Sequence, residues 1–219
     1  MAKLVVFGAG DIARLAHFYF STDSEHEVIG FAVDAAYRTA DEFLGLPLVT
    51  MEEVSRLFPP STAKMFVALS YAKMNRVRAE KYAQAKAQGY ELVSYVSSRC
   101  SYLSQYPPGD NCFILEDNTV QPFVRIGNDV TLWSGNHIGH DSTIGDHCFI
   151  SSHVVVSGHV DIGASCFIGV NATLRNSIAV GERTLIGAGA VIMKSTAPGS
   201  VYPGPRSEPI SSTSDKLNF

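Results

Sequence analysis

Residues 126–163 read IGNDVTLWSGNHIGHDSTIGDHCFISSHVVVSGHVDIG, and every sixth position of this stretch, counted from its first residue, is aliphatic. The series extends in both directions, from residue 114 to residue 192. Its fourteen positions all carry Ile, Leu or Val, namely Ile114, Val120, Ile126, Leu132, Ile138, Ile144, Ile150, Val156, Ile162, Ile168, Leu174, Val180, Ile186 and Ile192. Because hydrophobic residues make up only 46% of the chain, composition does not account for this series. The stretch is a hexapeptide repeat, and a fixed period of this kind is typical of a solenoid.

Two further residue classes recur with the repeat. Glycine follows the aliphatic residue in seven hexads, where we expect a tight corner to need unusual backbone angles: Gly127, Gly139, Gly145, Gly163, Gly169, Gly181 and Gly187. Small or β-branched residues stand two positions before it and are expected to point inward with it: Val130, Cys148, Val154, Val160, Cys166, Ala172, Ile178 and Ala190. Cys148 and Cys166 are 18 residues apart, so we expect them to stack as packing residues.

This pattern resembles the left-handed parallel β-helix, in which three hexapeptides form one triangular coil. The resemblance implies that residues 18 apart stack on neighbouring coils at about 4.8 Å, the spacing of paired strands. Fourteen hexads then give between four and five coils. Each coil is expected to bury its aliphatic residues only against its neighbours, as solenoids do.

The first 96 residues alternate strand-like and helix-like segments. The predicted strands are Leu4–Gly8, Val28–Val33, Met65–Leu69 and Glu91–Tyr95, and two of the predicted helices are Ile12–Phe20 and Met74–Gln88. A capping box at Thr50–Glu53 predicts a further helix that runs to Phe58. Such alternation predicts an α/β domain with a parallel sheet. We therefore divide the chain into a Rossmann-like α/β half-domain, residues 1–96, and a left-handed β-helix domain with a C-terminal cap, residues 97–219.

Charge and composition exclude several classes of protein. The chain has 17 Lys and Arg against 21 Asp and Glu, and its basic residues are scattered, so nucleic-acid binding is not expected. The apolar run Leu4–Ala9 is far shorter than the roughly 20 residues of a membrane helix, and we expect neither a membrane span nor a secretory signal. The four cysteines form no CxxC pair, which favours reduced thiols and a cytoplasmic location.

A candidate nucleotide site lies near the N-terminus. Gly8 and Gly10 open a predicted helix after a predicted strand, and Asp34 ends the second strand. A tight glycine turn at a helix N-terminus suits an anion, and the carboxylate suits a ribose or a base. Ser70 and Tyr71, at the end of the third strand, are further candidates for its rim. A glycine-rich turn without a ligand is the alternative. Too few residues precede the repeat for a full dinucleotide domain, which disfavours hydride transfer.

A candidate catalytic pair lies in the coils, where five of the seven histidines fall between residues 137 and 159. His140 stands two residues after an aliphatic position, where side chains leave the prism, and Asp141 follows it. An imidazole beside a carboxylate is suited to act as a general base. One coil later, Gly158 should lie below His140 and His159 below Asp141. A glycine there leaves room and a backbone N–H for an oxyanion.

With the short N-terminal domain, the coils and the stretch His140–Asp146, the chain resembles bacterial acyltransferases that N-acetylate nucleotide-linked 4-amino-4,6-dideoxysugars, as in the bacillosamine and perosamine pathways of surface-glycan (lipopolysaccharide O-antigen) synthesis. Some relatives O-acetylate sialic acid. The resemblance implies His140 as general base and Asp141 as its orienting partner. It also implies a homotrimer with active sites between subunits and no metal. Acetyl-coenzyme A would lie along the coils beside Gly158, His159, Gly187 and Ala188.

Two features depart from that family. The second histidine that some bacillosamine-type members carry nine residues after the base is Phe149 here. The ending Val201–Arg206 only loosely matches the family's, so the adenine end of the coenzyme site stays open.

Three alternatives remain at the level of the sequence. A γ-type carbonic anhydrase is also a trimeric β-helix with histidine ligands, but His153 and His159 should project from different faces of the prism. A β-helical scaffold would keep the nucleotide pocket and transfer nothing. Within acyl transfer the acceptor could be a hydroxyl, although the resemblance favours an amine.

Overall fold

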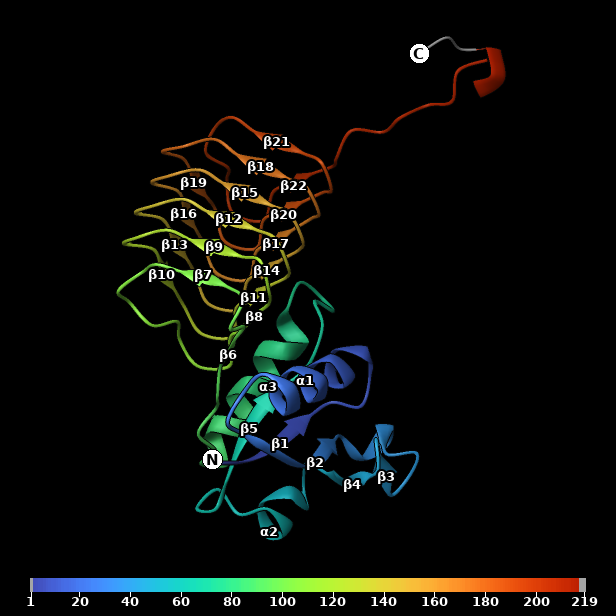
Figure 1. Ribbon diagram of the computed structural model, residues 1–219, viewed down its shortest axis with the longest axis vertical. Helices are drawn as coiled ribbons and strands as arrows, with labels where there is room; N and C mark the ends of the chain where they lie inside the picture. Colours follow the sequence, from blue (N-terminus) through green and yellow to red (C-terminus); the bar gives the residue numbers. More distant parts are fainter. Residues whose placement is uncertain (1, 217–219) are drawn as a thin grey trace.

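The computed structural model describes residues 2–216, and Figure 1 shows an α/β domain below a stack of short strands. The sheet of the α/β domain contains β1 (Lys3–Phe7), β2 (Glu27–Val33), β3 (Glu42–Phe43), β4 (Leu46–Thr50) and β5 (Ala63–Val67) in the order β3-β4-β2-β1-β5. Its strands are parallel except for β3, which pairs antiparallel with β4. The helices are α1 (Asp11–Thr22), α2 (Val54–Leu57) and α3 (Arg76–Ala87), with single 3-10 turns at Ala35–Tyr37 and Ser214–Lys216.

Both faces of this sheet are covered. Leu4 and Val6 of β1 pack in one hydrophobic cluster with Phe20 of α1, while Val5 and Phe7 pack in another with Ala85 of α3. A strand that is buried on both faces reads as a continuous apolar run, and such strands are typical of parallel sheets. The predicted parallel α/β arrangement is therefore confirmed.

Two predictions for this domain need correction. The predicted strand Glu91–Tyr95 is wrong: Leu92 forms a single bridge with Met65, and the chain then crosses to the coils, where the Tyr95 N–H donates to the Cys112 carbonyl at 2.8 Å. The hairpin of β3 and β4 was not predicted. The capping box does form, since Glu53 Oε2 accepts from the Thr50 N–H at 3.2 Å, but α2 is a single turn.

The coils form three parallel sheets, which are the faces of a prism. The first face contains β6 (Tyr95–Val96), β8 (Phe113–Ile114), β11 (Thr131–Leu132), β14 (Phe149–Ile150), β17 (Phe167–Ile168), β20 (Leu185–Ile186) and β22 (Val201–Tyr202). The second face contains β7 (Ser101–Tyr102), β9 (Thr119–Val120), β12 (His137–Ile138), β15 (Val155–Val156), β18 (Thr173–Leu174) and β21 (Val191–Ile192). The third face contains β10 (Arg125–Ile126), β13 (Thr143–Ile144), β16 (Asp161–Ile162) and β19 (Ala179–Val180).

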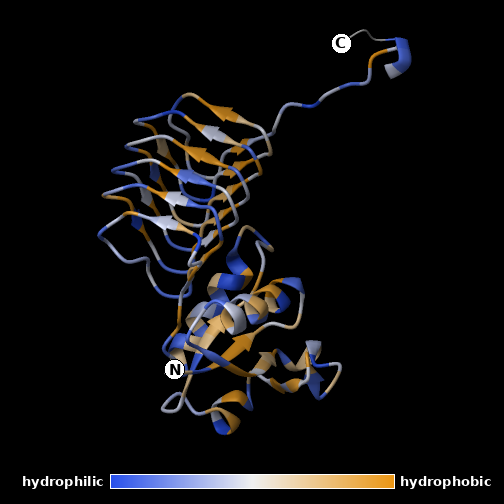
Figure 2. Ribbon diagram, in the orientation of Figure 1, coloured by the Kyte–Doolittle hydropathy of each residue, from blue (hydrophilic) through white to orange (hydrophobic). Residues whose placement is uncertain are grey.

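The register confirms the predicted repeat. Ile126 pairs with Ile144 and Ile144 with Ile162, so residues 18 apart are neighbours on successive coils. All fourteen aliphatic positions are buried inside the prism, and Figure 2 shows hydrophobic residues along most of its strands. Cys148 and Cys166 are buried in the same core, and burial raises the pKa of the Cys148 thiol. The two cysteines are packing residues, as predicted.

The expected reason for the corner glycines is wrong. None of the seven has a positive φ; the left-handed conformation falls two residues later, as at Asp141 (φ 57°) after Gly139 and His147 (φ 61°) after Gly145. Glycine is needed because neighbouring coils approach each other closely. A Cβ built on Gly139, for example, would lie 2.5 Å from the backbone nitrogen of Gly158.

The α/β domain packs on the first face of the prism. Phe113 and Leu115 of the first coil belong to its hydrophobic core, and the Tyr71 ring packs edge-on or tilted against Phe149 and Phe167, with ring centroids 5.0 and 4.7 Å away. The corner between the second and third faces therefore lies on the opposite side of the prism from the α/β domain.

No helix in residues 2–216 is both long enough and apolar enough to cross a bilayer.

Candidate active site

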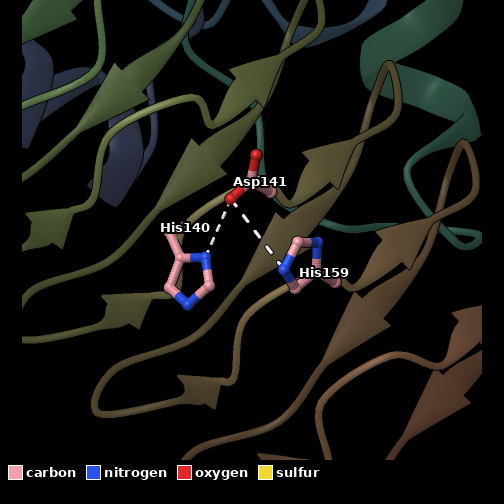
Figure 3. A group of neighbouring side chains, drawn as sticks. All are labelled: His140, Asp141 and His159. Atoms are coloured by element: carbon pink, nitrogen blue, oxygen red, sulfur yellow. Dashed lines mark hydrogen bonds and ion pairs between the residues drawn. The ribbon is translucent and has the colours of Figure 1, made fainter.

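His140 and Asp141 form a hydrogen-bonded pair at the corner between the second and third faces, directly after β12 (Figure 3). The distance from His140 Nδ1 to Asp141 Oδ2 is 2.8 Å. Asp141 adopts the left-handed conformation that Asp tolerates better than most residues. The His140 backbone N–H donates to Gln121 Oε1 at 2.8 Å, which anchors the corner to the coil before it.

The second ring nitrogen of His140 faces Gly158 on the next coil. A Cβ built on Gly158 would lie 2.7 Å from His140 Nε2, so the glycine leaves room for the ring. Within residues 2–216 the Gly158 N–H donates to no protein acceptor. With Nδ1 engaged by Asp141, Nε2 is the nitrogen available for proton transfer. A free backbone N–H beside it is suited to stabilise a developing oxyanion.

His159 also reaches this corner. Its Nε2 lies 4.0 Å from Asp141 Oδ2, and its ring stands at 88° to that of His140 with the centroids 5.0 Å apart. The sequence placed His159 below Asp141, and the structure brings its side chain to the carboxylate. All three side chains are about half exposed.

The remaining coil histidines lie elsewhere. His147, at the corner between the third and first faces, pairs with the buried Asp129 at 2.8 Å. His153 lies at the corner between the first and second faces, where it packs beside Gly135. His153 and His159 therefore do not share a corner, in line with the expectation that they project from different faces.

The ligand atoms of His140, Asp141 and His159 lie within 4.8 Å of one another, which makes the group worth testing as a metal site. His140 Nδ1 is already held by the carboxylate. A metal on the imidazole would occupy the lone pair that a general base must keep free, so metal binding and proton transfer are alternative uses of this group.

The candidate nucleotide residues Gly8, Gly10 and Asp34 line one cavity of about 390 Å³ at the ends of β1 and β2. Gly8 has a φ of 134°, and a Cβ there would lie 2.7 Å from the Ala68 carbonyl oxygen. Lys81 of α3 also lines the cavity, and its Nζ lies 2.5 Å from Asp34 Oδ1. Sequence reasoning missed Lys81 because it lies 47 residues from its partner in an ordinary polar helix.

The other candidates are more dispersed. Ser70 lines an adjoining cavity of about 430 Å³ that it shares with Gly10. Tyr71 lies on the first face of the prism, against Phe149 and Phe167. Gly187 and Ala188 lie at the corner between the first and second faces. Within one chain they do not share the corner of His140.

Family models match the coils in two places. Residues 123–158 match the bacterial transferase hexapeptide (six repeats), and residues 159–194 match the hexapeptide repeat of succinyl-transferase. The coils are built from transferase-type hexapeptide repeats. A comparison with curated proteins found no match.

Solved structures match nearly the whole chain. The acetyltransferase domain of PglB from Neisseria gonorrhoeae FA1090 superposes with a TM-score of 0.79 and 22% identity, covering 96% of this chain and 100% of that one. A mutant of perosamine N-acetyltransferase from Caulobacter crescentus gives 0.77 and 21%, covering 92% and 93%. WeeI from Acinetobacter baumannii AYE gives 0.73 and 18%, covering 92% and 96%. This chain has their fold.

Proposed function

We propose that this protein is an acyltransferase that moves an acetyl group from acetyl-coenzyme A to the amino group of a nucleotide-linked 4-amino-4,6-dideoxysugar. The observation that carries the proposal is the His140–Asp141 pair with its free Nε2 over Gly158. Two structural neighbours support the choice of substrates. The PglB domain was solved with acetyl-coenzyme A, and the perosamine enzyme with coenzyme A and GDP-perosamine.

The site residues suit each step of this reaction. The amine nitrogen attacks the thioester carbonyl carbon, and His140 Nε2 accepts the proton that the nitrogen loses. The Gly158 N–H donates to the oxyanion of the tetrahedral intermediate. The C–S bond then breaks, and the leaving sulfur takes the proton from His140. The products are the N-acetylated sugar and free coenzyme A, and the base is restored.

We assign nucleotide binding to the α/β domain, which we interpret as a Rossmann-like half-fold. Gly8 and Gly10 would approach the diphosphate at the N-terminus of α1. Asp34 would reach the ribose or base, with Ser70 beside the sugar end. Lys81 already pairs with Asp34, so it would hold the carboxylate or meet a phosphate.

We assign the complete active site to a homotrimer. His140 lies at the corner opposite the face that carries its own α/β domain. A nucleotide sugar in the cavity of one chain is therefore on the wrong side of the prism for the base of the same chain. A neighbouring subunit must bring a second cavity to His140. A cytoplasmic location and a role in surface-glycan synthesis complete the proposal.

The decisive experiment measures thiol release from acetyl-coenzyme A with UDP-, GDP- and dTDP-linked 4-amino sugars. With one of these sugars, coenzyme A should be released at the same rate as the sugar gains the mass of an acetyl group. His140→Asn should slow turnover by about 10²-fold. A product cleaved by hydroxylamine would identify an O-acetyl ester instead. Silence across the panel would favour a binding scaffold.

Mixed trimers test the shared site. Gly10→Leu should fill the nucleotide cavity, since a Cβ there meets no atom within 4 Å. Gly10→Leu chains keep the base, and His140→Asn chains keep the cavity. When the two are co-expressed, activity should return at interfaces where the base of one chain meets the cavity of the other. If base and cavity belonged to the same chain, no mixture would be active. Light scattering should give the mass of three chains.

A further inference from the structure

The carboxylate of Asp141 lies between two imidazoles that come from successive coils (Figure 3). His140 Nδ1 approaches Asp141 Oδ2 at 2.8 Å from the same corner. His159 Nε2 approaches the same oxygen at 4.0 Å from the coil below. The proposed acyl transfer uses the contact of His140 with Asp141, and the contact of His159 has no part in it.

The backbone holds this arrangement in register. Asp141 and His159 are 18 residues apart and both have φ near 57°, so their side chains leave equivalent corners in the same direction. The His159 N–H donates to the His140 carbonyl at 2.9 Å, which ties the two corners together. The equivalent positions on the flanking coils are Phe123 and Ser177. Ionisable side chains therefore meet in this column only at the level of the proposed base.

The rings of His140 and His159 also contact each other. The edge-to-face geometry, 5.0 Å and 88°, is a favourable arrangement for two aromatic rings. Asp141 restrains the His140 ring from the Nδ1 side, and the His159 ring packs against it. All three side chains are about half exposed, so their contacts with one another and with the Gly158 backbone are what orient them.

We propose that His159 is a positioning residue for the base, an inference that rests on the proposed function. Its Nε2–H donates to Asp141 Oδ2 through a small side-chain rotation or a bridging water. Held by two donors, the carboxylate keeps its hydrogen bond to Nδ1, and Nε2 stays aimed over Gly158. This role differs from the acetyl-coenzyme A contact that the sequence suggested for His159.

Three substitutions separate the contributions of the ring and its donor. His159→Ala removes both, His159→Phe keeps a ring, and His159→Gln keeps an N–H donor. His159→Ala should lower kcat by about 10²-fold, the effect of a misplaced catalytic group, while KM for acetyl-coenzyme A stays within about twofold. His159→Gln should recover most of the loss and His159→Phe only part. Ser177→Ala, at the same corner one coil on, is the matched control.

Two kinetic outcomes overturn the inference. A raised KM for acetyl-coenzyme A with unchanged kcat would make His159 a coenzyme contact. Equal losses in all three variants, together with a lowered melting temperature, would make it a structural residue of the corner.

A measurement without substrate keeps this test separate from the proposed function. In nitrogen-15 spectra of the imidazoles, His159→Ala should shift the His140 Nδ1–H signal, and His159→Gln should return it toward the wild-type position. If wild-type protein releases no thiol yet the signal shifts, the proposed function fails while the coupling of the side chains stands. An unchanged His140 signal would overturn the inference whatever the activity.

Discussion

The imidazole of His140 lies against the backbone of Gly158, so closely that a Cβ on the glycine would come within 2.7 Å of Nε2. Gly158 does not have the positive φ that glycine favours. Glycine is therefore required at residue 158 because a larger residue would clash with the neighbouring imidazole ring.

Gly158→Ala should displace the His140 ring and lower kcat by about 10²-fold, because Nε2 of the base is then no longer aligned with the substrate amine. Steady-state kinetics and the melting temperature should be measured together. Asn176→Ala, one coil further along the same corner, should have wild-type kinetics. Full activity in Gly158→Ala would remove this glycine from the site.

Asp34→Asn should weaken binding of the nucleotide sugar, because a carboxylate suited to hydrogen-bond a ribose or base is lost. We expect KM for the sugar to rise about tenfold, the effect of one charged hydrogen bond, with a smaller change in kcat. Calorimetric titration with UDP, GDP and dTDP provides a second measure. The control is Asp41→Asn, whose carboxylate is exposed and pairs with Arg38. Unchanged binding of all three nucleotides would place their site elsewhere.

Arg78→Met should destabilise the contact between the α/β domain and the prism. The Arg78 Nε donates to Asp129 Oδ1 at 3.0 Å, and both side chains are buried. Removing Arg78 leaves the buried Asp129 carboxylate with Asn111 and His147 as its remaining side-chain partners, and losing the guanidinium should cost about 3 kcal/mol. Denaturant unfolding checks the loss. Arg76→Met, whose exposed partner is Glu80, should cost less than about 1 kcal/mol. A similar small effect at Arg78 would mean that the apolar contacts suffice.

Asp23 should make stability depend on pH in the acid range. Hydrogen bonds from Ser98 and from the Tyr95 hydroxyl lower the Asp23 pKa from 3.8 to about 2. Since the folded pKa is lower than the unfolded one, this stabilisation is present above pH 4 and is lost as the pH falls toward 2. Asp23→Asn should lower the free energy of unfolding at pH 7 by about 1 kcal/mol, since solvent screens the carboxylate, with the difference from wild type shrinking in acid. Asp11→Asn is the exposed control, and a constant difference between pH 6 and pH 2 would contradict this account.

Local pattern was enough to predict the coils and the contact between His140 and Asp141. The aliphatic series repeats every six residues, and each coil stacks on a copy of the same pattern, so register follows from spacing. His140 and Asp141 are adjacent in sequence, and one corner of the coil brings them together. The corner glycines were recognised for the wrong reason, since the clash that a side chain would cause is with the next coil and not within the turn.

Only the tertiary structure decided which residues far apart in the sequence meet. Arg78 of α3 contacts Asp129 of the coils across 51 residues, and Lys81 contacts Asp34 within the α/β domain across 47. Neither pair carries a local signal in the sequence. The choice of the first face for docking depends on surface complementarity and buried polar contacts between the domains. That choice places His140 opposite the α/β domain of its own chain, because a corner of a three-sided prism faces away from the remaining side.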